Sequence, residues 1–156
     1  MDATTHVTAI GAKAAADGFR PLADERFTAA FHRRKFMISR FGLVDTLIAV
    51  RVLDAPATRA FVERTQADAV EVALANKTRL PRGAGSAVEV FAIVVSDGAD
   101  TEAIDFVQSS MPTQWSCFTM SALIHGSQAR AMYEGRKLFG AAYIGGLKSR
   151  LAELIS

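Results

Sequence analysis

With 156 residues, half of them hydrophobic and 22% charged, the chain is long enough to bury a substantial core and too apolar to be intrinsically disordered. Its net charge of +2 is too small to imply a polyanionic partner. No stretch approaches the roughly 20 apolar residues of a membrane helix, no signal-peptide pattern is present, and Cys117 has no disulfide partner within the chain. These features predict a single cytoplasmic domain over residues 1–156, with no membrane partner.

The first predicted element is a helix from just after Phe19 to about Phe41, where hydrophobic side chains recur at helical spacing. Gly42 is suited to end this helix. A strand beginning at Phe36 is the alternative, but it would run for about eighteen residues, against a usual length of roughly three to ten. Residues 1–18 are expected to be flexible or weakly ordered.

Four strands are predicted, and the second of them, apolar on both faces except for Glu89, is expected at the centre of the sheet. Two consecutive strand-helix-strand units imply right-handed crossovers, so the first three strands are expected to be parallel. The fourth strand, with its polar alternation, is expected to lie antiparallel at an edge. The strands are residues 43–53, 88–95, 115–124 and 129–134, and the later helices are residues 56–75, 100–109 and 139–155.

The predicted order is therefore αβαβαββα, an α/β three-layer sandwich around a mixed four-stranded sheet. Asp45 and Arg51 make the first strand less suited to complete burial than the second, which favours the spatial order 1-2-3-4. In that order both crossover helices lie on one face, and the first and last helices cover the other.

Motifs for several common chemistries are missing. Gly83 and Gly85 precede a strand, whereas a phosphate loop needs glycines between a strand and a helix. No serine lies in a Gly-x-Ser-x-Gly elbow. We therefore expect no cofactor.

Restriction-enzyme-type nucleases also use a small mixed sheet, with an acidic residue on one strand and Glu-x-Lys on its neighbour to bind a metal ion. Asp45 and Glu89 fall on predicted strands here, but no lysine lies between Lys77 and Lys137. A catalytically empty nuclease-like fold is an alternative on topology alone.

Asp54, Asp97 and His125 end the three predicted parallel strands, so all three are expected at the same edge of the sheet. Two carboxylates and an imidazole are suited to a metal-assisted hydrolase or to acid-base catalysis. The simpler interpretation is that the two aspartates cap the following helices, as aspartate often does, with Asp100 competing with Asp97 for the same cap. Asp54, Asp97 and His125 are the candidate catalytic set, but the prediction favours helix capping and no metal.

Basic residues gather in the two segments that precede the first and second predicted strands, so they are expected at the amino end of the parallel sheet. Such a basic pole is suited to a phosphate backbone, although cations at helix C-termini produce the same polarity. Nucleic acid is therefore not the favoured partner. The basic pole consists of Arg33, Arg34, Lys35, Arg40, Lys77, Arg79 and Arg82.

Three glycines lie in the last predicted helix, Gly140, Gly145 and Gly146, where each costs about 0.5 to 1 kcal/mol relative to alanine. Close packing on the sheet, or a later helix start near Ala141, explains them most simply, and a homo-oligomer contact is the alternative. Taken together, the sequence predicts a non-enzymatic binding or regulatory module within an oligomer or larger assembly. The alternatives are the metal-assisted hydrolase and the nucleic-acid binder.

Overall fold

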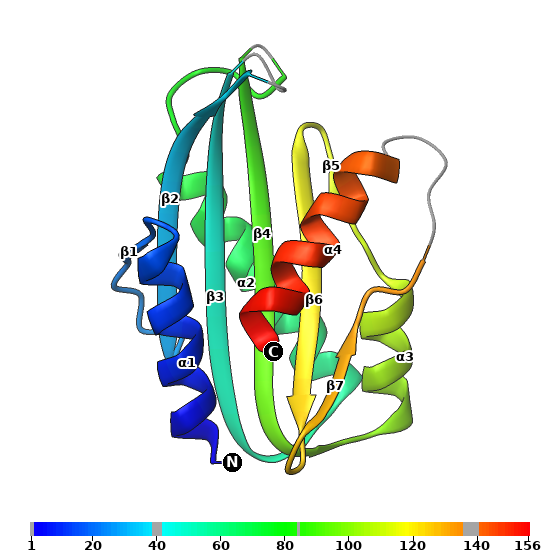
Figure 1. Cartoon of the computed structure of the whole chain (residues 1–156). Helices are drawn as coiled ribbons and strands as arrows, with labels where there is room; N and C mark the ends of the chain where they lie inside the picture. The colour runs from blue at the N-terminus through cyan, green and yellow to red at the C-terminus, as the bar shows by residue number, and fades with distance from the viewer. Residues whose placement is uncertain (1, 39–41, 84, 136–140) are drawn as a thin grey trace.

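The computed structural model describes residues 2–38, 42–83, 85–135 and 141–156. Within them the chain has an α/β fold with a mixed seven-stranded sheet and four helices (Figure 1). The helices are α1 (Ala3–Ala16), α2 (Arg59–Asn76), α3 (Thr101–Ser109) and α4 (Ala141–Ile155). The strands are β1 (Arg20–Pro21), β2 (Ala29–Met37), β3 (Gly42–Ala57), β4 (Ser86–Ala99), β5 (Thr113–Gln114), β6 (Cys117–His125) and β7 (Ala129–Met132).

The sheet has the order β1-β2-β3-β4-β6-β5, and β7 pairs with β6. Strands β3, β4 and β6 are parallel, as predicted, and β7 is antiparallel to β6. The prediction of four strands is wrong, because β1, β2 and β5 also pair into the sheet. No helix formed by the described residues is long and apolar enough to cross a membrane.

The largest correction concerns the segment from Phe19 to Phe41, where the structure has strands β1 and β2 in place of the predicted helix. Strand β2 pairs antiparallel with β3 over its whole length, from Ala29 opposite Val50 to Met37 opposite Gly42. The alanine, arginine and lysine residues of this segment favour helix, but propensity is a weak preference that tertiary pairing overrides.

A helix instead forms in the segment that was expected to be weakly ordered. The carboxylate of Asp2 accepts a hydrogen bond from the Thr5 amide (2.8 Å) and caps α1. Every fourth residue from His6, namely His6, Ile10 and Ala14, is buried against the sheet. This spacing is the usual signal of a helix that packs on one face.

Strand β3 continues beyond the predicted end at Leu53, because its pairing with β4 resumes after a register shift at Pro56. Asp54 therefore lies within a strand, and Thr58 caps α2 in its place. The prediction that Asp54 caps the helix is wrong. Asp100, not Asp97, caps α3, through a bond of 2.6 Å from the Ala103 amide to its side chain.

The two faces of the sheet carry different helices (Figure 1). Side chains of β3, β4 and β6 that include Ile48, Phe91 and Met120 pack with α1 and α4. The alternate side chains pack with α2 and α3. Strand β4 is buried on both faces from Ser86 to Ser96, as the prediction of a central strand required.

Val94→Ala is expected to lower the free energy of unfolding by about 1 to 3 kcal/mol, because Val94 is fully buried on β4 and its lost methyl groups leave a cavity. Val70→Ala is the matched control, since Val70 is only partly buried on α2. Urea denaturation of both variants checks the prediction. Equal urea midpoints for the two variants would show that Val94 on β4 is not a central residue of the hydrophobic core.

Candidate functional site

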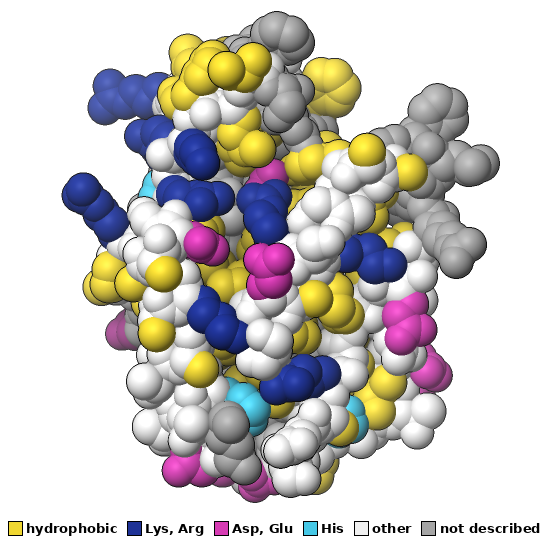
Figure 2. All heavy atoms as spheres, viewed as in Figure 1, with side chains coloured by type: hydrophobic (Ala, Val, Ile, Leu, Met, Phe, Trp, Pro, Cys, Tyr) yellow, Lys and Arg dark blue, Asp and Glu magenta, His cyan; other side chains and the backbone are white. Residues whose placement is uncertain are grey.

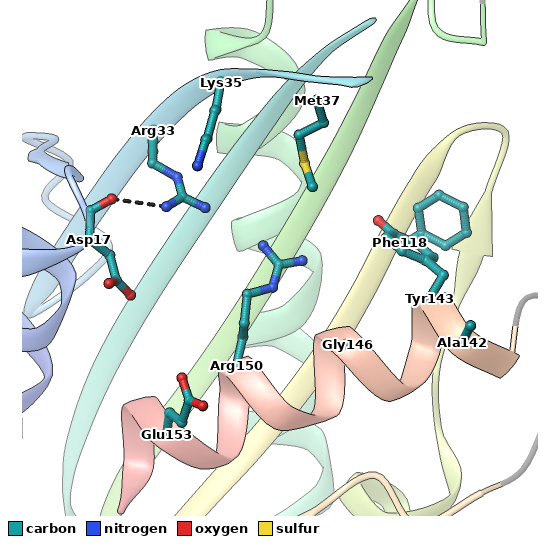
Figure 3. A pocket seen from close by; sticks show the side chains of 10 residues that line it. All are labelled: Asp17, Arg33, Lys35, Met37, Phe118, Ala142, Tyr143, Gly146, Arg150 and Glu153. Atoms are coloured by element: carbon teal, nitrogen blue, oxygen red, sulfur yellow. Dashed lines mark hydrogen bonds between the residues drawn. The ribbon is translucent and has the colours of Figure 1, made fainter. Parts of the chain in front are cut away.

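Helices α1 and α4 leave part of their shared face of the sheet uncovered, and the hollow between them has a volume of about 910 Å³ (Figure 3). Its wall combines cations with apolar and small side chains, and two acidic residues lie at one end. The lining residues are Asp17, Arg33, Lys35, Met37, Phe118, Ala142, Tyr143, Gly146, Arg150 and Glu153.

The floor of the hollow is a row of residues in register across the sheet. Arg33 on β2 lies opposite Thr46 on β3, Thr46 lies opposite Glu89 on β4, and Glu89 lies opposite Phe118 on β6. Because side chains alternate along a strand, Lys35 and Met37 share the face of Arg33. The antiparallel pairing of β2 with β3 therefore places two cations of β2 on the face of the sheet that carries the hollow.

The buried Glu89 carboxylate organises the α4 side of the hollow. It accepts hydrogen bonds from Thr46 Oγ1 (3.1 Å), from the Tyr143 hydroxyl (2.7 Å) and from Arg150 Nη2 (2.8 Å). The Tyr143 ring also packs edge-on against Phe118, with ring centroids 4.7 Å apart. A carboxylate removed from water needs such compensation, and these bonds fix the positions of Tyr143 and Arg150.

The guanidinium of Arg33 faces the hollow from the opposite side. It donates to the Asp17 carbonyl oxygen (2.9 Å) and lies over the Phe19 ring, but its buried Nε has no hydrogen-bond partner among the described residues. Burial lowers the pKa of Arg33, and the nearby Arg150 lowers it further. In Figure 3, Arg33, Lys35 and Arg150 point toward one another. An anion placed among them would offset the repulsion between the three cations and would replace the water that Arg33 has lost as a hydrogen-bond acceptor.

Helix α4 presents two small residues, Ala142 and Gly146, to the hollow on the same side as Arg150. Ala142, Gly146 and Arg150 are spaced four residues apart and all line it. A Cβ at Gly145 or Gly146 would meet no other atom within 4 Å, so these glycines do not serve close packing on the sheet, contrary to the simpler interpretation of the sequence. Gly140 lies outside the described residues. The homo-oligomer contact through this helix stays a prediction.

The opposite face of the sheet carries a second buried carboxylate, Asp45. It accepts hydrogen bonds from Arg34 Nε (2.8 Å) and from the Thr78 amide (2.8 Å), and His32 Nε2 lies 2.9 Å from its Oδ1. Burial acts to raise the pKa of Asp45, but the bonds from His32, Thr78 and Arg34 outweigh it and hold the pKa below its usual value.

The structure divides the predicted basic pole. Arg33 and Lys35 face the hollow, Arg34 pairs with Asp45 on the other face, and Lys77 donates to the carbonyl oxygens of Thr78 and Leu80. Arg79 is exposed and Arg82 half-buried in the loop before β4, and Arg40 lies outside the described residues.

Asp45 and Glu89 lie on neighbouring strands but on opposite faces, since Thr46 is the residue that pairs with Glu89. They therefore do not form the shared acidic pair of a nuclease site. Among the described residues, no group of three His, Cys, Asp or Glu side chains is placed to hold a metal ion.

Asp54 and Asp97 lie at the carboxyl end of the parallel strands and line a smaller hollow of about 290 Å³ together with His6 and Ser96. His125 ends β6 opposite Ser96, but it is not among the residues that line this hollow. The structure thus brings together two of the three candidate catalytic residues.

Sequence reasoning missed Tyr143, Phe118 and Arg150 as site residues, and it assigned Arg33 and Lys35 to a different surface. The spacing of Ala142, Gly146 and Arg150 was a signal in the sequence for a helix face with room beside it. The partners of that face come from three strands distant in sequence, which no local pattern identifies.

No protein-family model matches the chain, and no curated protein matches it. Among solved structures, the chain aligns with one titled as the MspJI restriction endonuclease in complex with a 27-mer oligonucleotide, at 16% sequence identity and a TM-score of 0.33. The alignment covers 99% of this chain and 32% of that one. Similarity at this level supports no inference about function.

Proposed function

We propose that the protein is a binding module for an amphipathic organic anion, held in the hollow between α1 and α4. The observation that carries the proposal is the convergence of Arg33, Lys35 and Arg150 on a hollow whose remaining wall is largely apolar. Binding sites for small molecules commonly combine an apolar wall with a few polar groups that fix the orientation of the ligand.

The arrangement of the wall defines the orientation of such a ligand. Met37, Phe118 and Ala142 lie toward one end of the hollow, whereas Asp17 and Glu153 lie toward the other (Figure 3). An acidic group placed among the three cations would therefore extend its apolar tail toward Phe118, because the carboxylates at the other end repel an anion. The Lys35 ammonium group, which lines the hollow, is a donor available to that acidic group.

Two of the three cations, Arg33 and Arg150, are fixed in position by the protein before a ligand binds. Glu89 fixes Arg150, and the Asp17 carbonyl oxygen with the Phe19 ring fixes Arg33. Pre-organised donors lose little conformational entropy on binding, which favours affinity. The small side chains of Ala142 and Gly146 leave the space that the tail requires.

Isothermal titration with decanoate tests the proposal, and we expect saturable binding that decyltrimethylammonium does not reproduce. Lys35→Met should weaken decanoate binding roughly ten-fold or more, because a charge-assisted hydrogen bond contributes about 1.5 to 3 kcal/mol. Gly146→Leu should abolish binding by filling the hollow.

Gly145→Leu is the matched control for Gly146→Leu. Both glycines lie on α4 with open space around them, but only Gly146 lines the hollow. Decanoate should bind the Gly145→Leu variant as it binds the parent. Equal affinity for the cationic amphiphile, or equal loss in both glycine variants, would contradict the proposed site.

A further inference from the structure

The large hydrophobic side chains that remain exposed in the described part of the chain gather at one end of the molecule. They are Phe36, Ile38, Leu80 and Trp115, with Ile38 78% and Trp115 76% exposed. Phe36 and Ile38 lie at the end of β2, Leu80 lies in the loop between α2 and β4, and Trp115 precedes β6. We call these four residues the sheet tip.

The topology explains why four residues so distant in sequence meet. Strands β3, β4 and β6 are parallel, so the segments before them lie at the same end of the sheet, and β2 ends there because it is antiparallel to β3. Figure 2 shows hydrophobic side chains at this end of the molecule, with Lys and Arg side chains beside them.

Specific contacts hold the tip segments together. Trp115 Nε1 donates to the Arg82 carbonyl oxygen (2.9 Å), and the indole lies against Gly83, where an added Cβ would come within 2.6 Å of Nε1. The Leu43 amide donates to the Gly85 carbonyl oxygen (2.9 Å) and ties β3 to the same loop. The Trp115 ring is therefore positioned by the protein although most of its surface faces solvent.

The charge around the sheet tip has one sign. Residues 33–38 and 77–83 each contain arginine and lysine, residues 112–116 contain neither, and none of the three segments contains aspartate or glutamate. The Asp45 carboxylate, which bonds Arg34 in the first of these segments, is buried and also bonded to His32. An apolar end surrounded by cations is complementary to a surface that is apolar inside and anionic outside.

We propose that the sheet tip docks peripherally on an anionic phospholipid membrane, with its four hydrophobic side chains entering the boundary between head groups and acyl chains. Tryptophan favours that boundary, and basic residues add attraction to anionic lipids. The sequence-based expectation of no membrane partner rested on the lack of a spanning run, which peripheral docking does not need. A nucleic-acid surface fits less well, because Arg34 is already paired with Asp45 and the projecting side chains are aliphatic as well as aromatic.

Trp115 is the one tryptophan of the chain, so its fluorescence reports directly on the sheet tip. The probe is a series of large unilamellar vesicles of phosphatidylcholine with increasing phosphatidylserine. With phosphatidylserine present, we expect a blue shift of the emission, quenching by brominated acyl chains and co-sedimentation of the protein. Pure phosphatidylcholine and high salt should each weaken the binding.

Variants at exposed positions test the assignment without disturbing the core. Ile38→Ser should remove the blue shift, and Arg79→Glu should weaken partitioning roughly ten-fold. Arg64→Glu, at an exposed position on α2, is the control and should bind more tightly than Arg79→Glu at equal net charge. Circular dichroism establishes that each variant keeps its fold.

Three results would overturn the proposal. The first is an emission spectrum that no vesicle composition shifts. The second is a shift of the Trp115 emission that depends on protein concentration in the absence of vesicles, which would show that the sheet tip mediates self-association. The third is tight, salt-dependent binding of an oligonucleotide that Ile38→Ser and Arg79→Glu abolish while vesicles have no effect.

Discussion

Glu89→Ala is expected to lower the free energy of unfolding by about 1 to 3 kcal/mol, because the buried Thr46 hydroxyl loses its acceptor and the missing side chain leaves a cavity. Arg150 would lose its carboxylate partner, and the Thr46 and Tyr143 hydroxyls would lose their acceptor. Chemical denaturation at neutral pH measures the loss.

A double variant separates the ion pair from the packing around it. Glu89→Met combined with Arg150→Met replaces both charges by apolar side chains, and we expect it to be more stable than Glu89→Ala. It should nevertheless bind decanoate roughly ten-fold or more weakly than the parent, because one of the three converging cations is gone. A double variant no more stable than Glu89→Ala would show that the pair is not the source of the loss.

Asp45→Ala is expected to destabilise the protein by about 1 to 3 kcal/mol, because the Thr78 amide and the Arg34 and His32 side chains lose a shared buried acceptor. Its carboxylate is 1% exposed and ties together β2 through Arg34 and His32 and the loop before β4 through the Thr78 amide. Asp45→Asn keeps an acceptor for one of these bonds and should be less destabilising.

The Asp45 network also predicts a pH dependence. The pKa of Asp45 is lower in the folded protein than its ordinary value, so the stabilisation is present above the unfolded-state pKa of about 3.9 and is lost as pH falls through the folded pKa. Denaturation midpoints of the parent should therefore fall more steeply below about pH 4 than those of Asp45→Asn. Parallel pH profiles would show that Asp45 titrates without coupling to folding.

The buried carboxylates of Asp45 and Glu89 show which parts of a site can be predicted from the sequence. Asp45 and Glu89 were recognised as unusual because each interrupts an apolar run. Their partners were not foreseen, since Arg34, Arg150 and Tyr143 lie 11, 61 and 54 positions away along the chain. A buried carboxylate can be recognised from the apolar residues around it in the sequence. The cation that pairs with it can be identified only from the tertiary structure.

Several features of the protein follow from the sequence by itself. Long apolar runs separated by helical segments determine β3, β4 and β6 as parallel neighbours, because a right-handed crossover leaves little other choice. Asp100 as a candidate cap and the helical segment that forms α4 could also be predicted, since capping and helical spacing are local properties.

The tertiary structure alone decided the state of residues 29–37 and the face on which each charged side chain lies. Pairing with β3 holds that segment as a strand against its helical preference, because a ladder of hydrogen bonds and the burial of Ala30 and Phe31 are gained only when the two segments meet. Once the register is fixed, the side chains of β2 alternate between the two faces of the sheet. Arg33 and Lys35 therefore face the hollow, and Arg34 faces Asp45. A shift of one residue would exchange them, so the site depends on a register that no local pattern specifies.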